Sequence, residues 1–229
     1  MNSEMVKEYG KNAGAEVVGI AASKDFDLAP SGFKPSDKLK GCLSVVVLGT
    51  PFPPEALSVD FSEYTKIRNG MLAKMDNTAK TVTKQIISNG YKAIAIGGIG
   101  GKYVNGKFYG HISLKHAAEL AGLGIIGRNY LLTNPEYGNL LWFSAILTDA
   151  DLVPDKKAQY TVCDKCNKCV EICPAKALDH PDSFGHQACA GTCWKLVNRK
   201  WELNCFLCRT VCPYTYAERD RINNNEYGY

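Results

Sequence analysis

The sequence predicts a mixed α/β protein, of the α/β or α+β layer type, followed by a cysteine-rich domain that binds metal. Three observations support this prediction. Short apolar, β-branched runs alternate with helical stretches in the first part of the chain. Nine of the ten cysteines then lie between Cys163 and Cys212. The chain has 229 residues, 45% hydrophobic and 22% charged, which is enough to form a buried core and excludes wholesale disorder.

The elements of the first domain follow in order along the chain. Apolar runs predict strands at residues 16–22, 41–49, 91–97 and 140–149. Helical periodicity predicts helices at residues 1–15, 57–88 and 111–122. Prolines after residue 50 end the second strand, and Asn89-Gly90 ends the long helix. Polar or glycine-rich composition predicts loops at 23–40 and 97–110.

The boundary between the two domains is expected where a polar segment, residues 154–160, precedes the crowded cysteines. We therefore predict one domain at residues 1–155 and a second at residues 156–229.

Charge and apolar patterning exclude several classes of protein. Lys and Arg number 27 against 23 Asp and Glu, and this net charge of +4 is no argument for nucleic acid. The longest apolar stretch, residues 140–147, is too short for a membrane span. The first ten residues lack the apolar core of a secretory signal. We expect a cytoplasmic protein with no membrane association, whose crowded cysteines bind metal rather than form disulfides.

The first cysteine run has the spacing of bacterial ferredoxins. It reads Cys163-x2-Cys166-x2-Cys169-x3-Cys173-Pro174. Three thiolates on one tight loop can hold three irons of a cubane, and the fourth commonly serves another cluster. Pro174 fits a first helical turn, where no backbone N–H is needed.

A second run repeats this pattern without its first cysteine. It contains Cys205, Cys208 and Cys212, again followed by a proline. Either Cys189 or Cys193 can supply the missing ligand, and the sequence does not choose between them. Nine cysteines thus provide eight ligands for two [4Fe-4S] clusters, with one to spare. Structural zinc explains neither the three-cysteine loop nor the two Cys-Pro endings. Cys42, inside an apolar strand, is expected to be an inert core thiol.

Ferredoxin geometry predicts that the ligands cross between the two runs, because each Cys-Pro thiolate serves the remote cluster. One predicted set is Cys163, Cys166, Cys169 and Cys212. The other is Cys205, Cys208, Cys173 and one of Cys189 and Cys193.

A glycine motif upstream has the residue spacing of the dinucleotide-binding fingerprint but not its structural context. Gly122, Gly124 and Gly127 have the G-x-G-x-x-G spacing. A helix precedes these glycines where the fingerprint needs a strand, and the following segment is broken by Pro135 and Gly138. Nicotinamide binding is therefore not expected here.

The same stretch resembles a known family. Residues 121–152 (AGLGIIGRNYLLTNPEYGNLLWFSAILTDADL), and then CDKCNKCVEICPAKAL, resemble the epoxyqueuosine reductases and their relatives, the reductive dehalogenases. Residues 40–53 (KGCLSVVVLGTPFP) also resemble their early strand. The resemblance covers about residues 40–213. It implies a nitroreductase-like α/β domain followed by a two-cluster bacterial ferredoxin-like domain, with cobalamin beside one cluster and electrons passing through the clusters to cobalt.

This resemblance directs attention to the glycine-rich run as a cofactor-binding segment. The expected contacts are Gly122, Gly124, Gly127, Arg128 and Asn129. Arg128 and Asn129 can reach an anionic cofactor group, and a capping or solvated role is the equal alternative.

The chain departs from the family where the catalytic Asp is found. No carboxylate lies between Asp76 and Glu119. If the chain is an enzyme, another side chain must donate a proton, and Tyr109 is the first candidate with His111 the second. A phenol is a weak acid, with an ordinary pKa of about 10, whereas imidazole titrates near neutrality.

Two functions follow from these observations. The first is an iron–sulfur oxidoreductase that resembles epoxyqueuosine reductase and uses a pocket-bound cofactor, cobalamin, or substrate. The second is an electron-transfer protein that reduces a partner such as a corrinoid protein. Both need an electron donor such as ferredoxin or flavodoxin. Little sequence follows the second cysteine run, so tRNA is not expected as a substrate.

Overall fold

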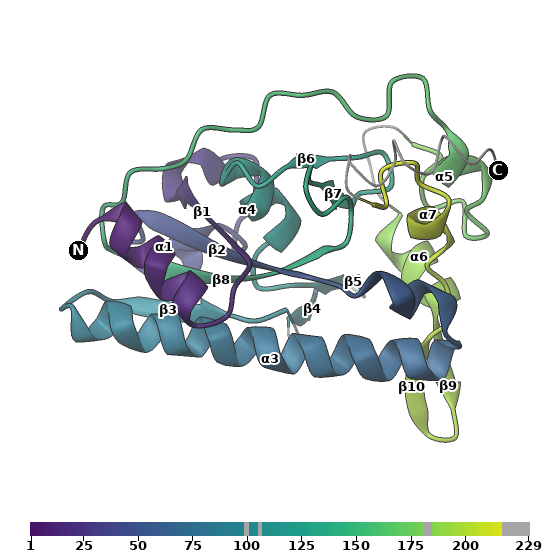
Figure 1. Ribbon diagram of the computed structural model, residues 1–229, viewed down its shortest axis with the longest axis horizontal. Coiled ribbons are helices and arrows are strands. Elements are labelled where there is room, and N and C mark those ends of the chain that lie inside the picture. Colours follow the sequence, from purple (N-terminus) through teal and green to yellow (C-terminus); the bar gives the residue numbers. More distant parts are fainter. Residues whose placement is uncertain (99–100, 105–106, 181–184, 217–229) are drawn as a thin grey trace. The chain divides into compact units, whose positions relative to one another are not determined.

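The computed structural model, drawn in Figure 1, describes residues 1–98, 101–104, 107–180 and 185–216. The chain divides into two compact units. Unit 1 comprises Met1–Pro51, Met71–Gly124 and Trp142–Gln159. Unit 2 comprises Phe52–Gly70, Ile125–Leu141 and Tyr160–Tyr229. Each unit thus combines segments that are far apart in the sequence, and the expected boundary near residue 155 remains a prediction.

A four-stranded sheet forms the centre of unit 1, with the strand order β1-β2-β8-β3. β1 pairs antiparallel with β2, with Val17 opposite Gly49, and β3 pairs antiparallel with β8. The four predicted strands are confirmed: β1 (Val17–Ala22), β2 (Ser44–Pro51), β3 (Ala93–Ile96) and β8 (Leu141–Thr148). Cys42 lies just before β2 rather than inside a strand, because the chain turns at Gly41 before pairing begins.

The longer helices of this unit come from three parts of the chain. They are α1 (Ser3–Asn12), the C-terminal part of α3 (Phe61–Ser88) and α4 (Leu114–Leu120). α3 begins later than expected because a short 3-10 helix, η2 (Pro54–Ser58), occupies the start of the predicted range. The buried core joins apolar side chains of α1 and α3 to one face of the sheet. Its fully buried members are Val6, Ile20, Val46, Ala79, Val82, Ile86 and Ile146.

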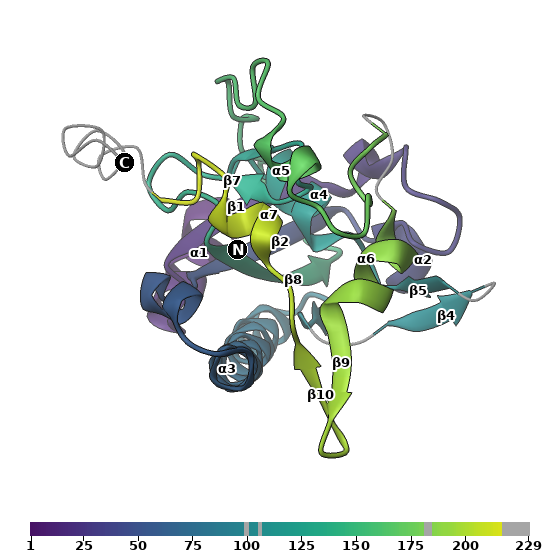
Figure 2. The ribbon, with the colours of Figure 1, turned by 90° about the vertical axis from the view of Figure 1, so that its right-hand side faces the viewer.

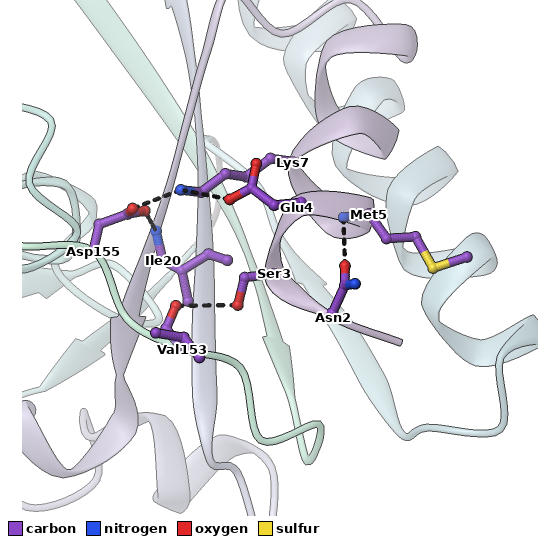
Figure 3. Close-up of polar contacts among 8 residues, drawn as sticks. All are labelled: Asn2, Ser3, Glu4, Met5, Lys7, Ile20, Val153 and Asp155. Atoms are coloured by element: carbon purple, nitrogen blue, oxygen red, sulfur yellow. Dashed lines mark hydrogen bonds and ion pairs between the residues drawn. The ribbon is translucent and has the colours of Figure 1, made fainter.

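The segment after β8 closes the free edge of β1, as Figure 3 shows. Asp155 donates its N–H to the Ile20 carbonyl at 2.8 Å, and the Ile20 N–H donates to Asp155 Oδ2 at 2.9 Å. Lys7 Nζ lies 2.6 Å from Asp155 Oδ1, and Ser3 Oγ donates to the Val153 carbonyl at 3.2 Å. The edge strand is therefore covered by the chain itself, which removes a site for unwanted strand pairing.

Two predicted loops contain regular structure. The segment at 97–110 includes a hairpin of β4 (Lys102–Val104) and β5 (Lys107–Tyr109), so the expectation of a loop there was wrong. The sequence contains Asn105-Gly106, a dipeptide that strongly indicates a hairpin. The prediction of a loop gave more weight to the glycine-rich composition of the segment. The segment at 23–40 includes η1 (Ser23–Phe26) and α2 (Pro35–Lys38), where Asp37 caps its own helix by accepting the Lys34 N–H.

Unit 2 is built from short elements around the cysteines. They are β6 (Ile125–Ile126), β7 (Leu132–Thr133), α5 (Lys168–Glu171), α6 (His186–Cys193), β9 (Trp194–Val197), β10 (Lys200–Leu203) and α7 (Leu207–Thr210). β9 and β10 form a two-stranded hairpin that directly follows α6 (Figure 2). Over the described ranges of the chain, no helix is both long and apolar enough to cross a membrane.

Candidate functional site

The cysteines of unit 2 lie on two similar loop–helix segments. In the first, α5 lies between Cys166 and Cys173, and in the second, α7 lies between Cys205 and Cys212. The two helices pack against each other. All ten cysteines of the chain are free thiols, and those of unit 2 are buried or half-buried. The absence of disulfides and the concentration of thiols at one place suit a metal cluster with sulfur ligands.

Backbone N–H groups point at two of these sulfurs. The Arg128 N–H donates to Cys163 Sγ at 3.3 Å, and the Tyr214 N–H donates to Cys212 Sγ at 3.4 Å. Cys163 itself has a φ of 63°, in the left-handed region, where the chain turns sharply at the start of the first run. Such N–H donors stabilise the thiolate form, which is the form that binds metal.

The glycine-rich segment that carries the family resemblance contacts both cysteine runs. Arg128 reaches Cys163 of the first run through its backbone, as described above. Asn129 reaches the second run, because its Nδ2 donates to the Cys208 carbonyl at 3.0 Å. Asn129 Oδ1 also accepts the Leu131 N–H at 3.1 Å, and the side chain is buried. Two adjacent residues therefore hold both loops in one place.

The thiols of the first predicted ligand set share one electrostatic environment. Burial raises the pKa of Cys169, and the charges of Cys163, Cys212 and Cys166 raise this pKa further. Burial also raises the pKa of Cys212. Hydrogen bonds from Tyr214 and Asn139 oppose that shift, and Cys163 and Cys166 add to it.

Three of the remaining thiols, Cys189, Cys193 and Cys205, interact electrostatically with one another or with Cys208. Burial raises the pKa of Cys208 to about 12. Arg209 opposes this shift, and Cys189, Cys205 and also Cys169 of the first set add to it. A side-chain hydrogen bond with Cys189 lowers the pKa of Cys193, against the effects of burial and of Cys205. Both candidates for the missing ligand are thus neighbours of the second run, and the structure does not favour one of them. Cys173 is half-buried after α5, and its assignment to this set stays a prediction.

A buried arginine within the second cysteine run was missed by sequence reasoning. Arg209 is 6% exposed and follows Cys208 directly. Its Nη1 donates to the Asn139 carbonyl and, at 3.1 Å, to Asn139 Oδ1. Burial lowers the pKa of Arg209, while the charges of Tyr64, Cys208 and Cys212 act in the opposite direction. A single arginine in a cysteine run carries no sequence signal for burial, since its partner Asn139 is 70 positions away.

The five expected cofactor-binding residues have mainly internal contacts in the structure. A Cβ added to Gly122, whose φ is +73°, would collide with the Lys156 carbonyl. A Cβ on Gly127 would lie 3.2 Å from Cys163 Sγ, and Gly124 is buried. The exception is Arg128, whose Nε is buried without a hydrogen-bond partner among the described residues. A cofactor contact remains a prediction for this segment.

The two candidate proton donors lie in unit 1, at and just after the β4–β5 hairpin. Tyr109 is half-buried on β5, with its ring centroid 4.9 Å from that of Phe33. His111 is exposed. Their catalytic roles remain predictions.

A carboxylate does reach the glycine-rich loop from outside it. Asp76 Oδ1, on α3, accepts the Gly98 N–H at 2.9 Å. Inspection of the sequence around residue 109 missed this contact, because α3 delivers the group across 22 positions. Asp76 thereby fixes the base of the segment that carries Tyr109.

The donor set of unit 2 fits iron–sulfur clusters. The four thiolates of a cubane bind four different irons, so they line a cavity rather than converge on one point. The free thiols, their grouping and the N–H donors aimed at sulfur are the features that a cluster needs.

The mixed α/β fold and the cysteine-rich unit together indicate the class of protein. The chain resembles the epoxyqueuosine reductase-like oxidoreductases, as the sequence indicated. Epoxyqueuosine reductase of Bacillus subtilis is 31% identical over 116 residues, which cover 45% of this chain and 29% of that protein. The enzyme of Gloeobacter violaceus is 34% identical over 125 residues, which cover 48% of this chain and 38% of that protein. The matched regions thus span about a third of these curated relatives.

Solved structures agree with this resemblance at the level of the fold. Epoxyqueuosine reductase from Bacillus subtilis has a TM-score of 0.64 at 20% identity, covering 93% of this chain and 64% of that one. A catabolic reductive dehalogenase has a TM-score of 0.65 at 20% identity, covering 96% of this chain and 33% of that one. No family model matches the chain.

Proposed function

We propose that the protein is an iron–sulfur oxidoreductase that passes single electrons through two [4Fe-4S] clusters in unit 2 to a cofactor or substrate. One observation carries this proposal: Arg128 and Asn129, within the family-like run, hold the first and second cysteine runs respectively. The run and the cysteines are therefore parts of one site rather than two unrelated motifs.

The proposed ligand sets cross between the two runs. Cys163, Cys166, Cys169 and Cys212 would hold one cluster, and this is supported by the environment that these four thiols share. The remaining set is Cys205, Cys208, Cys173 and one of Cys189 and Cys193. The packing of α5 on α7 supports the proposed ferredoxin-like arrangement.

The residues around the thiols prepare them for this role. The Arg128 and Tyr214 N–H groups would compensate negative charge on the coordinating sulfurs. Arg209 supplies a buried positive charge beside Cys208 and Cys212. When bound, the clusters supply one-electron chemistry. The free thiols must lose their protons to bind iron, so cluster insertion releases protons.

Cobalamin is the proposed cofactor at the end of this path. A reductive dehalogenase with a TM-score of 0.66 is described in connection with B12-dependent dehalogenation. On this chain, the buried Nε of Arg128 is the group available to an acceptor atom of a cofactor. Cobalamin would supply a strongly reducing metal centre, and Tyr109 or His111 would donate a proton to the reduced product.

The first experiment measures the metal content of anaerobically purified protein. We expect about eight iron and eight acid-labile sulfide per chain, because two four-thiolate sites are encoded. About four iron, or zinc in place of iron, would contradict the proposal. Variants at Cys212 and Cys173 test the crossing, since each should impair the cluster of the other run.

A second candidate function is an electron-transfer protein that reduces a partner such as a corrinoid protein. The exposed position of His111 and the packing of Tyr109 on Phe33 favour it, because His111 faces solvent and the Tyr109 ring already contacts another side chain. Titration with cobalamin separates the two functions. A base-off spectrum with about one cobalamin per chain supports the reductase, and no binding supports the carrier. If the protein is a reductase, Tyr109→Phe and His111→Ala, each with intact clusters, should slow its corrinoid-dependent reduction of a substrate mimic. If it is an electron carrier, neither substitution should have this effect.

A further inference from the structure

The β9–β10 hairpin presents one continuous apolar face. Leu196 lies opposite Trp201 in the antiparallel register, and Trp194 lies opposite Leu203. Because side chains alternate along a strand, these four share one face of the hairpin. The other face carries Lys195 opposite Glu202 and Val197 opposite Lys200.

The inner half of this apolar face is covered within unit 2, and the outer half is not. Near the base, the Arg68 guanidinium lies 4.9 Å from the Trp194 ring centroid, and the Leu203 N–H donates to Thr65 Oγ1 at 2.9 Å. Toward the turn, Leu196 is 60% exposed and Trp201 is 62% exposed. A Trp and a Leu that face each other in solvent form a small apolar patch of the kind that marks interaction sites.

The end of the hairpin that carries this patch is positively charged. Arg199 occupies the turn and Lys200 follows it, whereas Lys195 lies opposite its only carboxylate, Glu202. Both turn residues, Asn198 and Arg199, have positive φ, as a tight two-residue hairpin turn requires. The apolar pair and the basic turn are thus held on a defined scaffold.

The hairpin also connects directly to the proposed clusters. β9 begins at the residue after Cys193, and β10 ends two residues before Cys205. The two strands that carry the patch are thus continuous in the chain with two candidate cluster ligands. The small size of the patch matches electron-transfer complexes, whose interfaces are among the smallest known, at under about 1,200 Å².

We propose that the β9–β10 hairpin is the docking site for an acidic one-electron carrier protein, which reduces the clusters of unit 2. This inference rests on the proposed function. In the step itself, the reduced carrier loses one electron and an oxidised cluster gains it, with no bond made or broken. Acidic side chains of the carrier pair with Arg199 and Lys200, and its apolar centre covers Leu196 and Trp201.

The test uses anaerobic, cluster-loaded protein and bacterial flavodoxin hydroquinone, with the bleaching of cluster absorbance followed by stopped flow. The pair Leu196→Ala/Trp201→Ala should lower the second-order rate at least about tenfold, because these two side chains form the apolar centre of the proposed interface, where truncation has its largest effect. The pair Arg199→Glu/Lys200→Glu should also lower the rate and weaken its dependence on ionic strength. The second pair alters only exposed side chains and keeps the proposal testable if the first pair misfolds.

Matched controls separate docking from cluster loss. Leu28→Ala and Lys24→Glu change an exposed apolar and an exposed basic side chain of unit 1, and both should react like the unaltered protein. Dithionite, which needs no docking, should reduce every variant at the unaltered rate. If the unaltered protein lacks iron or resists dithionite, the proposed function fails rather than the docking site.

Two results would overturn the inference. One is an unchanged flavodoxin rate in both hairpin variants with intact clusters. The other is a hairpin that binds nucleic acid instead, seen as a gel shift with pooled tRNA that the charge variants abolish while the flavodoxin rate stays normal.

Discussion

Replacing Asp155 by Ala should loosen the edge of the unit 1 sheet far more than replacing its ion-pair partner Lys7. The Ile20 side chain is fully buried, and the Ile20 N–H donates to Asp155 Oδ2. Losing a charged hydrogen-bond acceptor there costs about 1.5–3 kcal/mol. The Lys7–Asp155 pair, with side chains 22% and 30% exposed, adds at most about 1 kcal/mol. Asp155→Ala should therefore cost about 2–4 kcal/mol, and Lys7→Met about 1 kcal/mol or less.

Hydrogen exchange of the Ile20 amide measures the local opening of this sheet edge in the folded protein. The method does not depend on global unfolding being two-state, which proteins that bind metals often do not satisfy. Exchange should rise by about 30-fold or more in Asp155→Ala, since 1.4 kcal/mol is a factor of ten. Asp155→Asn keeps an acceptor oxygen and should lie near Lys7→Met. Asp151→Ala, which removes an exposed carboxylate from the same segment, is the matched control. Equal exchange in the Asp155→Ala and Lys7→Met variants, or a large effect of Asp151→Ala, would refute the reasoning.

Three further predictions concern single residues. Arg209→Met should speed the loss of iron to a chelator. Arg209→Lys should rescue this only in part, because a buried ammonium is more strongly hydrated and loses its charge more readily than a guanidinium; equal rates in all three proteins would contradict the proposed role. Gly70→Ala, in the exposed part of α3 with open space around the added Cβ, should stabilise the protein by about 0.5–1 kcal/mol and raise its melting temperature. Cys42 should react slowly with iodoacetamide at pH 8 in the folded protein. Burial raises its pKa, and less thiolate is then present at that pH than for an ordinary cysteine; rapid labelling of Cys42 would show that its environment is open.

The elements that could be predicted from sequence are those with local signals. The strands at 17–22 and 44–51 are apolar runs rich in Val, and prolines follow the second one, so composition and neighbours agree. The β9–β10 hairpin gave no such signal. Its turn, Asn198-Arg199, lacks the glycine that usually marks a positive φ at the second central position.

The sequence indicated the cysteines of the candidate site but not the residues that support them. Ferredoxin spacing alone pointed to these cysteines, and their role as cluster ligands stays a prediction. Asn129, by contrast, contacts Cys208 across 79 positions, and Arg209 contacts Asn139 across 70. Contacts of this range depend on how the whole unit folds, so no short pattern in a single sequence indicates them.

With clusters bound as proposed, the position of the hairpin between Cys193 and Cys205 would couple electron delivery to the maturation of the protein. A two-stranded hairpin is marginally stable by itself in water, and metal binding at both of its ends would supply the missing order. A chain that has not received its clusters would then offer the donor no structured landing place. The reduced carrier would transfer electrons only to molecules that hold clusters. Newly made chains would not be reduced until iron and sulfide have been inserted.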